Sequence, residues 1–187
     1  MHKQFFAILF LMVKKIFLDN KDFHFTKSDL PALIHGEEHA GASLFTISIF
    51  ADLYSQGLKV VALTGYPMAI EEFGKQVGSS ENVHFFTKEK TGEFVDFVQS
   101  STDIDNHVVL IKNIEFYGEE VFNTVKDFKY LIVSGDFNKC SFKNILLQHP
   151  FTTKIYFSPL DAPLSDLQKY EGLLVSEKHH GVVTIEV

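Results

Sequence analysis

Short runs of apolar residues, rich in β-branched side chains, recur along this chain and constrain its fold more than any other feature. From Ala32 onward amphipathic stretches separate these runs, at a spacing of roughly 20 to 25 residues. Most runs are nearly continuous in apolar residues, as expected of strands that are covered on both faces. The pattern predicts an α/β fold of three layers, in which a mostly parallel sheet lies between helices. The predicted strands are Ala32–His35, Lys59–Thr64, Val83–Thr87, Val108–Ile111, Tyr130–Ser134 and Lys154–Phe157.

The segments between these runs carry apolar residues at helical spacing. The clearest is Ser43–Tyr54, where Leu44, Ile47 and Ala51 fall on one face. The periodicity is weaker further along the chain. The predicted helices are Ser43–Tyr54, Ala69–Val77, Glu93–Gln99, Glu119–Phe128 and Asp161–Tyr170.

Both ends of the chain predict β-hairpins. Two apolar runs flank residues 178–181 near the C-terminus, and Lys15–Leu18 with Phe23–Phe25 predicts a smaller hairpin around Asn20 and Lys21. The length of 187 residues is typical of one domain. We therefore expect a single domain: an N-terminal extension with its hairpin in residues 1–30, a core in 31–160, and a helix with a closing hairpin in 161–187.

The charged residues limit the partners that we expect. Lysine accounts for all 17 basic residues, and with 24 acidic residues the net charge is −7. Without arginine the chain cannot grip a phosphate in bidentate fashion, and its acidity disfavours a nucleic-acid backbone. A lone cysteine, Cys140, forms no internal disulfide, and it is expected to be a small packing residue. These features indicate a cytoplasmic protein without a nucleic-acid partner.

The N-terminal residues resemble the start of a signal peptide, because the apolar run Phe5–Val13 follows Lys3. No small-residue cleavage motif follows, and the run is too short to span a bilayer. We expect a short packing segment and no membrane partner. Two alternatives stay open, namely an upstream extension with Met12 as the natural start, and a targeting segment.

A glycine-bearing loop between the first predicted core strand and the strongest predicted helix carries the functional argument. In the phosphate-binding loop G-x-x-x-x-G-K-[ST], backbone N–H groups surround phosphates, the lysine reaches the β- and γ-phosphates, and the hydroxyl holds Mg²⁺. Here two glycines and a serine are in register, but alanine replaces the lysine. The candidate cofactor-binding residues are Gly36, Glu37, Glu38, His39, Ala40, Gly41, Ala42 and Ser43.

This loop resembles a degenerate Walker A motif, and the order of elements from about Ala32 to Val187 resembles that of the RecA-like (KaiC/RadA-type) P-loop ATPases. The resemblance implies a RecA-like P-loop NTPase fold with a C-terminal β-hairpin. It also implies an aspartate for Mg²⁺ at the end of a later strand, where this chain has Lys112 or Asn113. Members of the KaiC type place paired glutamates after the second strand, whereas Glu71 and Glu72 come several residues late.

Phosphoryl transfer depends on charge neutralisation and on positioned groups. This chain lacks the loop lysine, the aspartate for Mg²⁺ (the Walker B aspartate), the glutamates directly after the second strand and every arginine. These losses argue against efficient phosphoryl transfer. The resemblance therefore implies a pseudo-ATPase with no catalytic residue, no metal ion and no cofactor, acting as a structural or regulatory subunit with a protein partner or a second copy of itself. The alternative is a weak or partner-dependent ATPase that binds ATP and Mg²⁺. In it Ser43 holds the ion, Lys59 or Lys112 replaces the missing cation, and a neighbour supplies arginine.

A simpler interpretation needs no ligand. Gly36 and Gly41 then only permit a tight turn from strand to helix, and Ser43 begins the helix. On the same view His35 and His39 form local hydrogen bonds, and the histidines near the C-terminal turn bind no metal.

Overall fold

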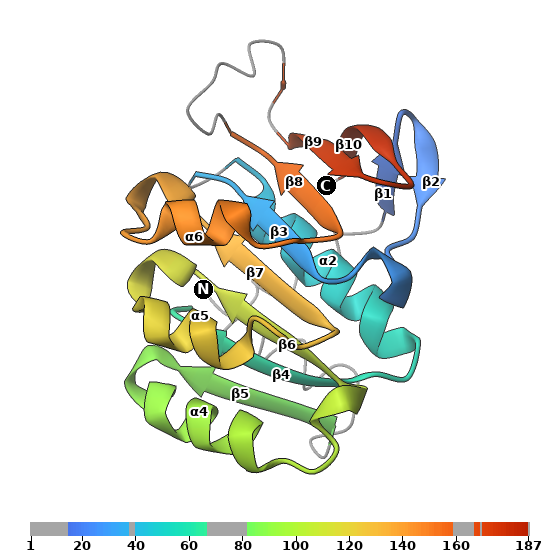
Figure 1. The fold of residues 1–187 in the computed structure, drawn as a ribbon. Coiled ribbons are helices and arrows are strands. Elements are labelled where there is room, and N and C mark those ends of the chain that lie inside the picture. The colour runs from blue at the N-terminus through green and yellow to red at the C-terminus, as the bar shows by residue number, and fades with distance from the viewer. Residues whose placement is uncertain (1–14, 38–39, 67–81, 159–166, 169, 187) are drawn as a thin grey trace, which may run out of the picture.

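The computed structural model describes residues 15–37, 40–66, 82–158, 167–168 and 170–186, and its described strands form one ten-stranded sheet (Figure 1). The strand order is β2-β1-β10-β9-β8-β3-β7-β6-β4-β5. The strands are β1 (Lys15–Leu18), β2 (Lys21–Phe23), β3 (Ala32–His35), β4 (Lys59–Thr64), β5 (Val83–Thr87), β6 (His107–Lys112), β7 (Leu131–Gly135), β8 (Thr153–Tyr156), β9 (Glu171–Ser176) and β10 (His180–Glu186).

The six strands from β8 to β5 in this order are parallel to one another, which confirms the predicted mostly parallel sheet. Every predicted core strand lies within one residue of its observed bounds. The described α-helices are α2 (Ala42–Ser55), α4 (Thr91–Ser100), α5 (Glu119–Val125) and α6 (Lys143–Gln148). The expected helix Ala69–Val77, most of Asp161–Tyr170 and the apolar run Phe5–Val13 lie outside the described residues.

Alternate residues of the parallel strands pack into two separate cores, because successive side chains of a strand point to opposite faces. In β6, Val108 and Leu110 pack on the face covered by α2, whereas Val109 and Ile111 pack against α4, α5 and α6. Figure 1 shows α4, α5 and α6 together on one face and α2 behind the sheet. The three layers of the prediction are therefore present.

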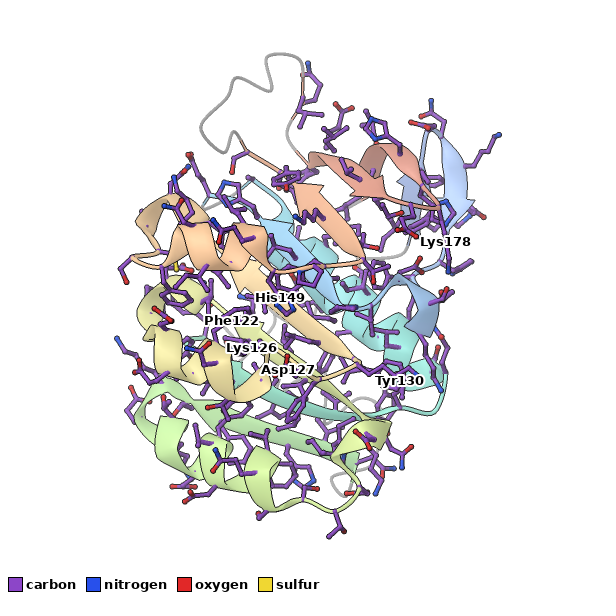
Figure 2. The ribbon with its side chains drawn as sticks, viewed as in Figure 1. Phe122, Lys126, Asp127, Tyr130, His149 and Lys178 are labelled. Carbon is purple, nitrogen blue, oxygen red and sulfur yellow. The ribbon has the colours of Figure 1, made fainter. Side chains whose placement is uncertain are left out.

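Sequence periodicity did not predict α6, a helix of six residues. Aromatic rings hold it in place: Phe122 of α5 stacks with Phe142 at 6.3 Å, and meets the edge of His149 at 5.4 Å. Phe122 and His149 are labelled in the side-chain view, where they lie beside each other between α5 and α6 (Figure 2). Such a short helix depends on tertiary packing, since an isolated helix of this length is unstable in water.

The rest of the sheet is antiparallel. β8 pairs with β9, β9 with β10, β10 with β1, and β1 with β2. The closing hairpin of β9 and β10 is confirmed. The N-terminal hairpin is also present, but its second strand is Lys21–Phe23, because Asp19 and Asn20 form the turn with φ of 49° and 64°.

No described helix is long and apolar enough to cross a membrane.

Phe45 links α2 to two other parts of the fold. It is fully buried, and its ring lies 6.5 Å from the ring of Phe25 and 5.4 Å from that of Phe157. Phe45→Ala should therefore lower the free energy of unfolding by about 3–5 kcal/mol. Phe116→Ala, the same change at a site that is 38% exposed, should cost less than half as much. Urea denaturation measures both; equal losses would contradict this role of Phe45.

Candidate functional site

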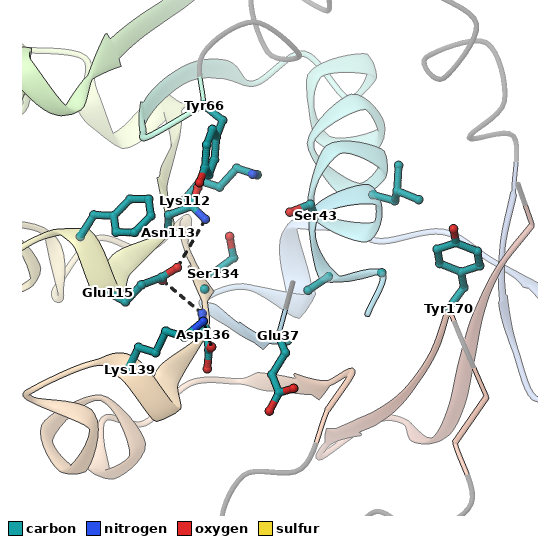
Figure 3. Close-up of a pocket in the computed structure, with 16 residues that line it drawn as sticks. Glu37, Ser43, Tyr66, Lys112, Asn113, Glu115, Ser134, Asp136, Lys139 and Tyr170 are labelled. Atoms are coloured by element: carbon teal, nitrogen blue, oxygen red, sulfur yellow. Dashed lines mark hydrogen bonds and ion pairs between the residues drawn. The ribbon is translucent and has the colours of Figure 1, made fainter. Parts of the chain in front are cut away.

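A cavity of about 490 Å³ lies at the carboxyl ends of the parallel strands β3, β7, β6 and β4. The first turn of α2 forms one wall, and Lys112, Glu115 and Asp136 contribute charged side chains to the others (Figure 3). Ligands of open α/β sheets bind outside this edge of the sheet. The fold therefore places the cavity where a ligand is expected.

Five of the eight candidate loop residues line the cavity: Gly36, Glu37, Gly41, Ala42 and Ser43. Ala40 does not appear in the lining, and Glu38 and His39 lie outside the described residues. A Cβ atom on Gly36 would lie 2.5 Å from the Cβ of Ala42, so glycine is needed for the two ends of the loop to meet.

Several backbone N–H groups of the loop are already used within the protein. Gly36 donates to the carbonyl of Gly135 at 3.1 Å, and Glu37 donates to the Ser158 hydroxyl at 2.7 Å. Ala40 donates to the carbonyl of Glu37 at 3.2 Å. These described groups are therefore not available to a phosphate.

The first turn of α2 offers N–H groups in their place. Gly41 precedes the helix with φ of 114°, and its carbonyl accepts the first helical hydrogen bond, from Phe45. The N–H groups of Ala42, Ser43 and Leu44 precede that bond and have no partner within the helix. The N-cap residue is a glycine, which has no side chain to cap this end, and the first turn carries no acidic residue. The positive end of a 14-residue helix thus faces the cavity.

Lys112 is the last residue of β6, and the strand register sets it beside Ser134 of β7 and Thr64 of β4. Its side chain is only 7% exposed, yet it lines the cavity. Figure 3 shows the ammonium extending from β6 toward the first turn of α2, where Ser43 lies. Burial lowers the pKa of Lys112, and the nearby Glu115 carboxylate acts in the opposite direction.

The Glu115 carboxylate is held by groups of the protein. Its Oε2 atom accepts a hydrogen bond from the backbone N–H of Asp136 at 3.1 Å, and Asn113 donates to Oε1 at 3.5 Å. Asn113 has a left-handed backbone, with φ of 64°, which turns the chain at the end of β6. This carboxylate fixes the end of β7 against the turn after β6.

The other two carboxylates of the cavity are also placed away from a ligand. Asp136 is buried, accepts from the N–H of Asn138 at 3.1 Å, and pairs with the Lys139 ammonium at 2.9 Å. Figure 3 shows the carboxylate of Glu37 pointing away from Ser43 and Lys112. Lys112 therefore extends toward the α2 terminus, and none of the three described carboxylates of the lining lies beside it in that direction.

Two aromatic side chains stand at the mouth of the cavity. Tyr66 is 59% exposed and Phe116 is 38% exposed, and their rings meet edge to face at 6.1 Å. The Lys112 ammonium lies 5.7 Å from the centre of the Tyr66 ring, and Lys88 lies 5.4 Å from that of Phe116. The mouth therefore carries two exposed aromatic rings, each with a lysine ammonium over its face.

Several residues singled out from the sequence have structural roles. His35 is fully buried, and its Nδ1 atom accepts from the N–H of Phe137 at 3.1 Å, a hydrogen bond between β3 and the turn after β7. Cys140 packs in the core, and burial raises the pKa of its thiol. The hypothesis that Lys59 reaches the phosphates is wrong: it begins β4, at the opposite edge of the sheet, and pairs with Asp103.

The described residues of the site do not fit a magnesium ion. Its position at the end of β6 holds a cation, Lys112, followed by the neutral Asn113. Among the residues that the structure describes, no group of three or more His, Cys, Asp or Glu side chains is placed to hold a metal. A phosphate group, in contrast, fits the α2 terminus, the Ser43 hydroxyl and the Lys112 ammonium.

Sequence reasoning missed part of this lining: Glu115, Phe116, Lys139 and Tyr170. Asn113 could have indicated Glu115 and Phe116. Asparagine at the end of an apolar strand favours a left-handed turn, and such a turn brings the next residues back across the strand ends. Nothing local to Lys139 or Tyr170 indicates the cavity.

Comparison with solved structures identifies several NTPases with this fold, although no family model and no curated sequence matches the chain. The genome packaging NTPase B204 of Sulfolobus turreted icosahedral virus 2, in complex with AMPPCP, aligns with a TM-score of 0.62 and 11% identity, over 86% of this chain and 99% of B204. The pCW3 conjugation coupling protein TcpA, with ATPγS, aligns with a TM-score of 0.57 and 12% identity, over 94% of this chain and 68% of TcpA. The flagellar accessory protein FlaH of Methanocaldococcus jannaschii aligns with a TM-score of 0.50 and 14% identity, over 76% of this chain and 75% of FlaH.

At these identities the likeness concerns the fold, and the chain has the fold of the P-loop NTPases.

Lys112→Met should stabilise the protein, because the variant keeps an apolar stem and removes a charge that the fold has withdrawn from water. We expect a gain of about 1 kcal/mol at neutral pH in urea denaturation. The gain should shrink with rising pH. The pKa of Lys112 in the folded state lies below its ordinary value of 10.5. Between these two pH values the unfolded state binds more protons than the folded state, so the wild type gains stability as the pH rises.

Lys129→Met is the matched control, because it removes an exposed lysine and should change stability by less than about 0.5 kcal/mol. If Lys112→Met destabilised the protein equally at all pH values, the ammonium would carry no desolvation penalty.

Proposed function

We propose that this protein is a pseudo-ATPase. Its P-loop-type domain binds a nucleotide by the phosphates, does not hydrolyse it, and serves as a structural or regulatory subunit of a protein assembly. The observation that carries the proposal is the cation at the end of β6, facing the N-terminus of α2 across the cavity. This arrangement attracts phosphate and repels the metal ion on which hydrolysis depends.

The binding half of the proposal is supported by complementary charge. The α2 terminus supplies N–H donors, Ser43 is exposed at its second position, and Lys112 supplies an ammonium. The aromatic pair Tyr66 and Phe116 at the mouth provides a surface on which a base can stack. The similar structures with AMPPCP and ATPγS favour a nucleotide as the ligand.

The lack of hydrolysis follows from the carboxylates. Glu115 and Asp136 are held by backbone N–H groups, and Glu37 points away from the helix terminus. No described carboxylate of the cavity is thus placed to activate water at a phosphate bound by α2. Arginine is absent from the chain, so a transition-state arginine finger has to come from a partner.

The assembly role rests on the exposed aromatic pair at the cavity mouth. Large exposed apolar side chains gathered in one place mark sites of protein contact. Tyr66 and Phe116 are exposed at the cavity that the loop also lines, and the RecA-like resemblance implies a loop that faces a neighbouring subunit. A protein partner or a second copy of this chain would cover them.

Ser43→Glu tests ligand binding without harming the fold. The new carboxylate stabilises α2 at its first turn, by about 0.3–1 kcal/mol, but repels phosphate from the same place. Titration with a fluorescent ATP analogue should give saturable binding to the wild type and none to Ser43→Glu. Gly92→Glu, at the second position of α4 with open space around it, adds the same charge outside the cavity and should bind like the wild type.

Phosphate release should stay at the level of a heat-inactivated sample. Release above that level, abolished in Ser43→Glu and retained in Gly92→Glu, would show a true ATPase and refute the pseudo-enzyme.

A further inference from the structure

We propose that this site takes its phosphate ligand free of Mg²⁺, with the Lys112 ammonium standing in for both the missing loop lysine and the metal ion. The inference rests on the proposed function and names the charge state of its ligand. The ligand class is a metal-free nucleoside triphosphate, recognised by its phosphate chain.

The surroundings of Lys112 provide the first argument. Its side chain is 93% buried, as its relative exposure is 7%. Among the described residues the ammonium forms no ion pair; it lies 5.7 Å from the centre of the Tyr66 ring, and the Glu115 carboxylate acts on it only from beyond ion-pair distance, so burial still lowers its pKa. A cation buried in this way is costly unless an anion completes its surroundings. A bound phosphate would supply that anion.

The second argument is the direction of the side chain. The ammonium lines the cavity and extends toward the first turn of α2 (Figure 3). The N–H groups of Ala42, Ser43 and Leu44 point out of that turn. Donors from two separate elements, β6 and α2, therefore converge on one volume. An anion between them would accept hydrogen bonds from both sides.

The third argument concerns the metal. Mg²⁺ in nucleotide sites is held by one or two carboxylates together with the phosphates. At this edge Glu115 is bound to the N–H of Asp136, and the side chain that follows Lys112 is a neutral amide. A magnesium ion would meet the repulsion of the Lys112 ammonium, and the described part of the cavity offers no free carboxylate to offset it. The site should prefer the uncomplexed ligand.

Isothermal titration of the full chain with ATP and with inorganic tripolyphosphate, each in EDTA and in excess Mg²⁺, tests the inference. We expect both ligands to bind at least about tenfold more tightly in EDTA. In EDTA, Lys112→Met should weaken both by about tenfold or more, whereas Lys112→Arg keeps the charge and most of the affinity. Lys129→Met makes the same change in net charge away from the cavity and should stay within about twofold.

The outcomes separate this inference from the proposed function. Tighter binding in Mg²⁺ would overturn the inference and leave nucleotide binding intact. Binding in EDTA that survives Lys112→Met unchanged would remove Lys112 from the site. If neither ligand binds in either buffer, the proposed function fails as well. The comparison of buffers uses the wild type alone, so it holds even if a variant does not fold.

Discussion

Burial of the parallel strands on both faces is the constraint on which the rest of the structure depends. Since successive side chains of β6 and its neighbours enter two separate cores, these strands have no polar face, and polar side chains reach the protein surface where the strands end. The carboxyl ends of β3, β7, β6 and β4 gather at one edge, and α2 begins there. The cavity and its charges are a product of that arrangement.

Lys112 shows how this edge departs from a structure built for stability alone. The four residues before Lys112 are apolar and fully or almost fully buried. A fifth apolar residue at position 112 would continue this packing without burying a charge. An ammonium there opposes folding, and natural proteins accept such costs mainly at functional sites. The Glu115 carboxylate, although tied to the turn, offsets part of this cost, because it raises the pKa of Lys112 against the larger effect of burial.

The sequence determined the strands more reliably than the site. Strand positions follow from local patterns such as Val108–Ile111, and these were predicted to within a residue. Helix α6 was missed because its stability comes from rings, such as Phe122, that are distant in sequence. The loop with Ser43 was found by its motif. Lys112 was noticed as a departure from a family pattern, but its burial and direction depend on the packing of three strands and a helix. Glu115 was not predicted, because its partner lies 21 residues further along the chain.

The pairing of β1 with β10 sets an order for assembly during synthesis. Residues 15–18 pair on one side with the nearby residues 21–23, but their partners on the other side are residues 183–186, in the last described strand of the chain. The core strands β3 to β8 can pair with one another much earlier, as they emerge in turn. The amino-terminal hairpin of β1 and β2 therefore cannot join the sheet until β10 has been synthesised. This long-range closure makes the antiparallel half of the sheet a late step, during which its unpaired edges are exposed to other chains.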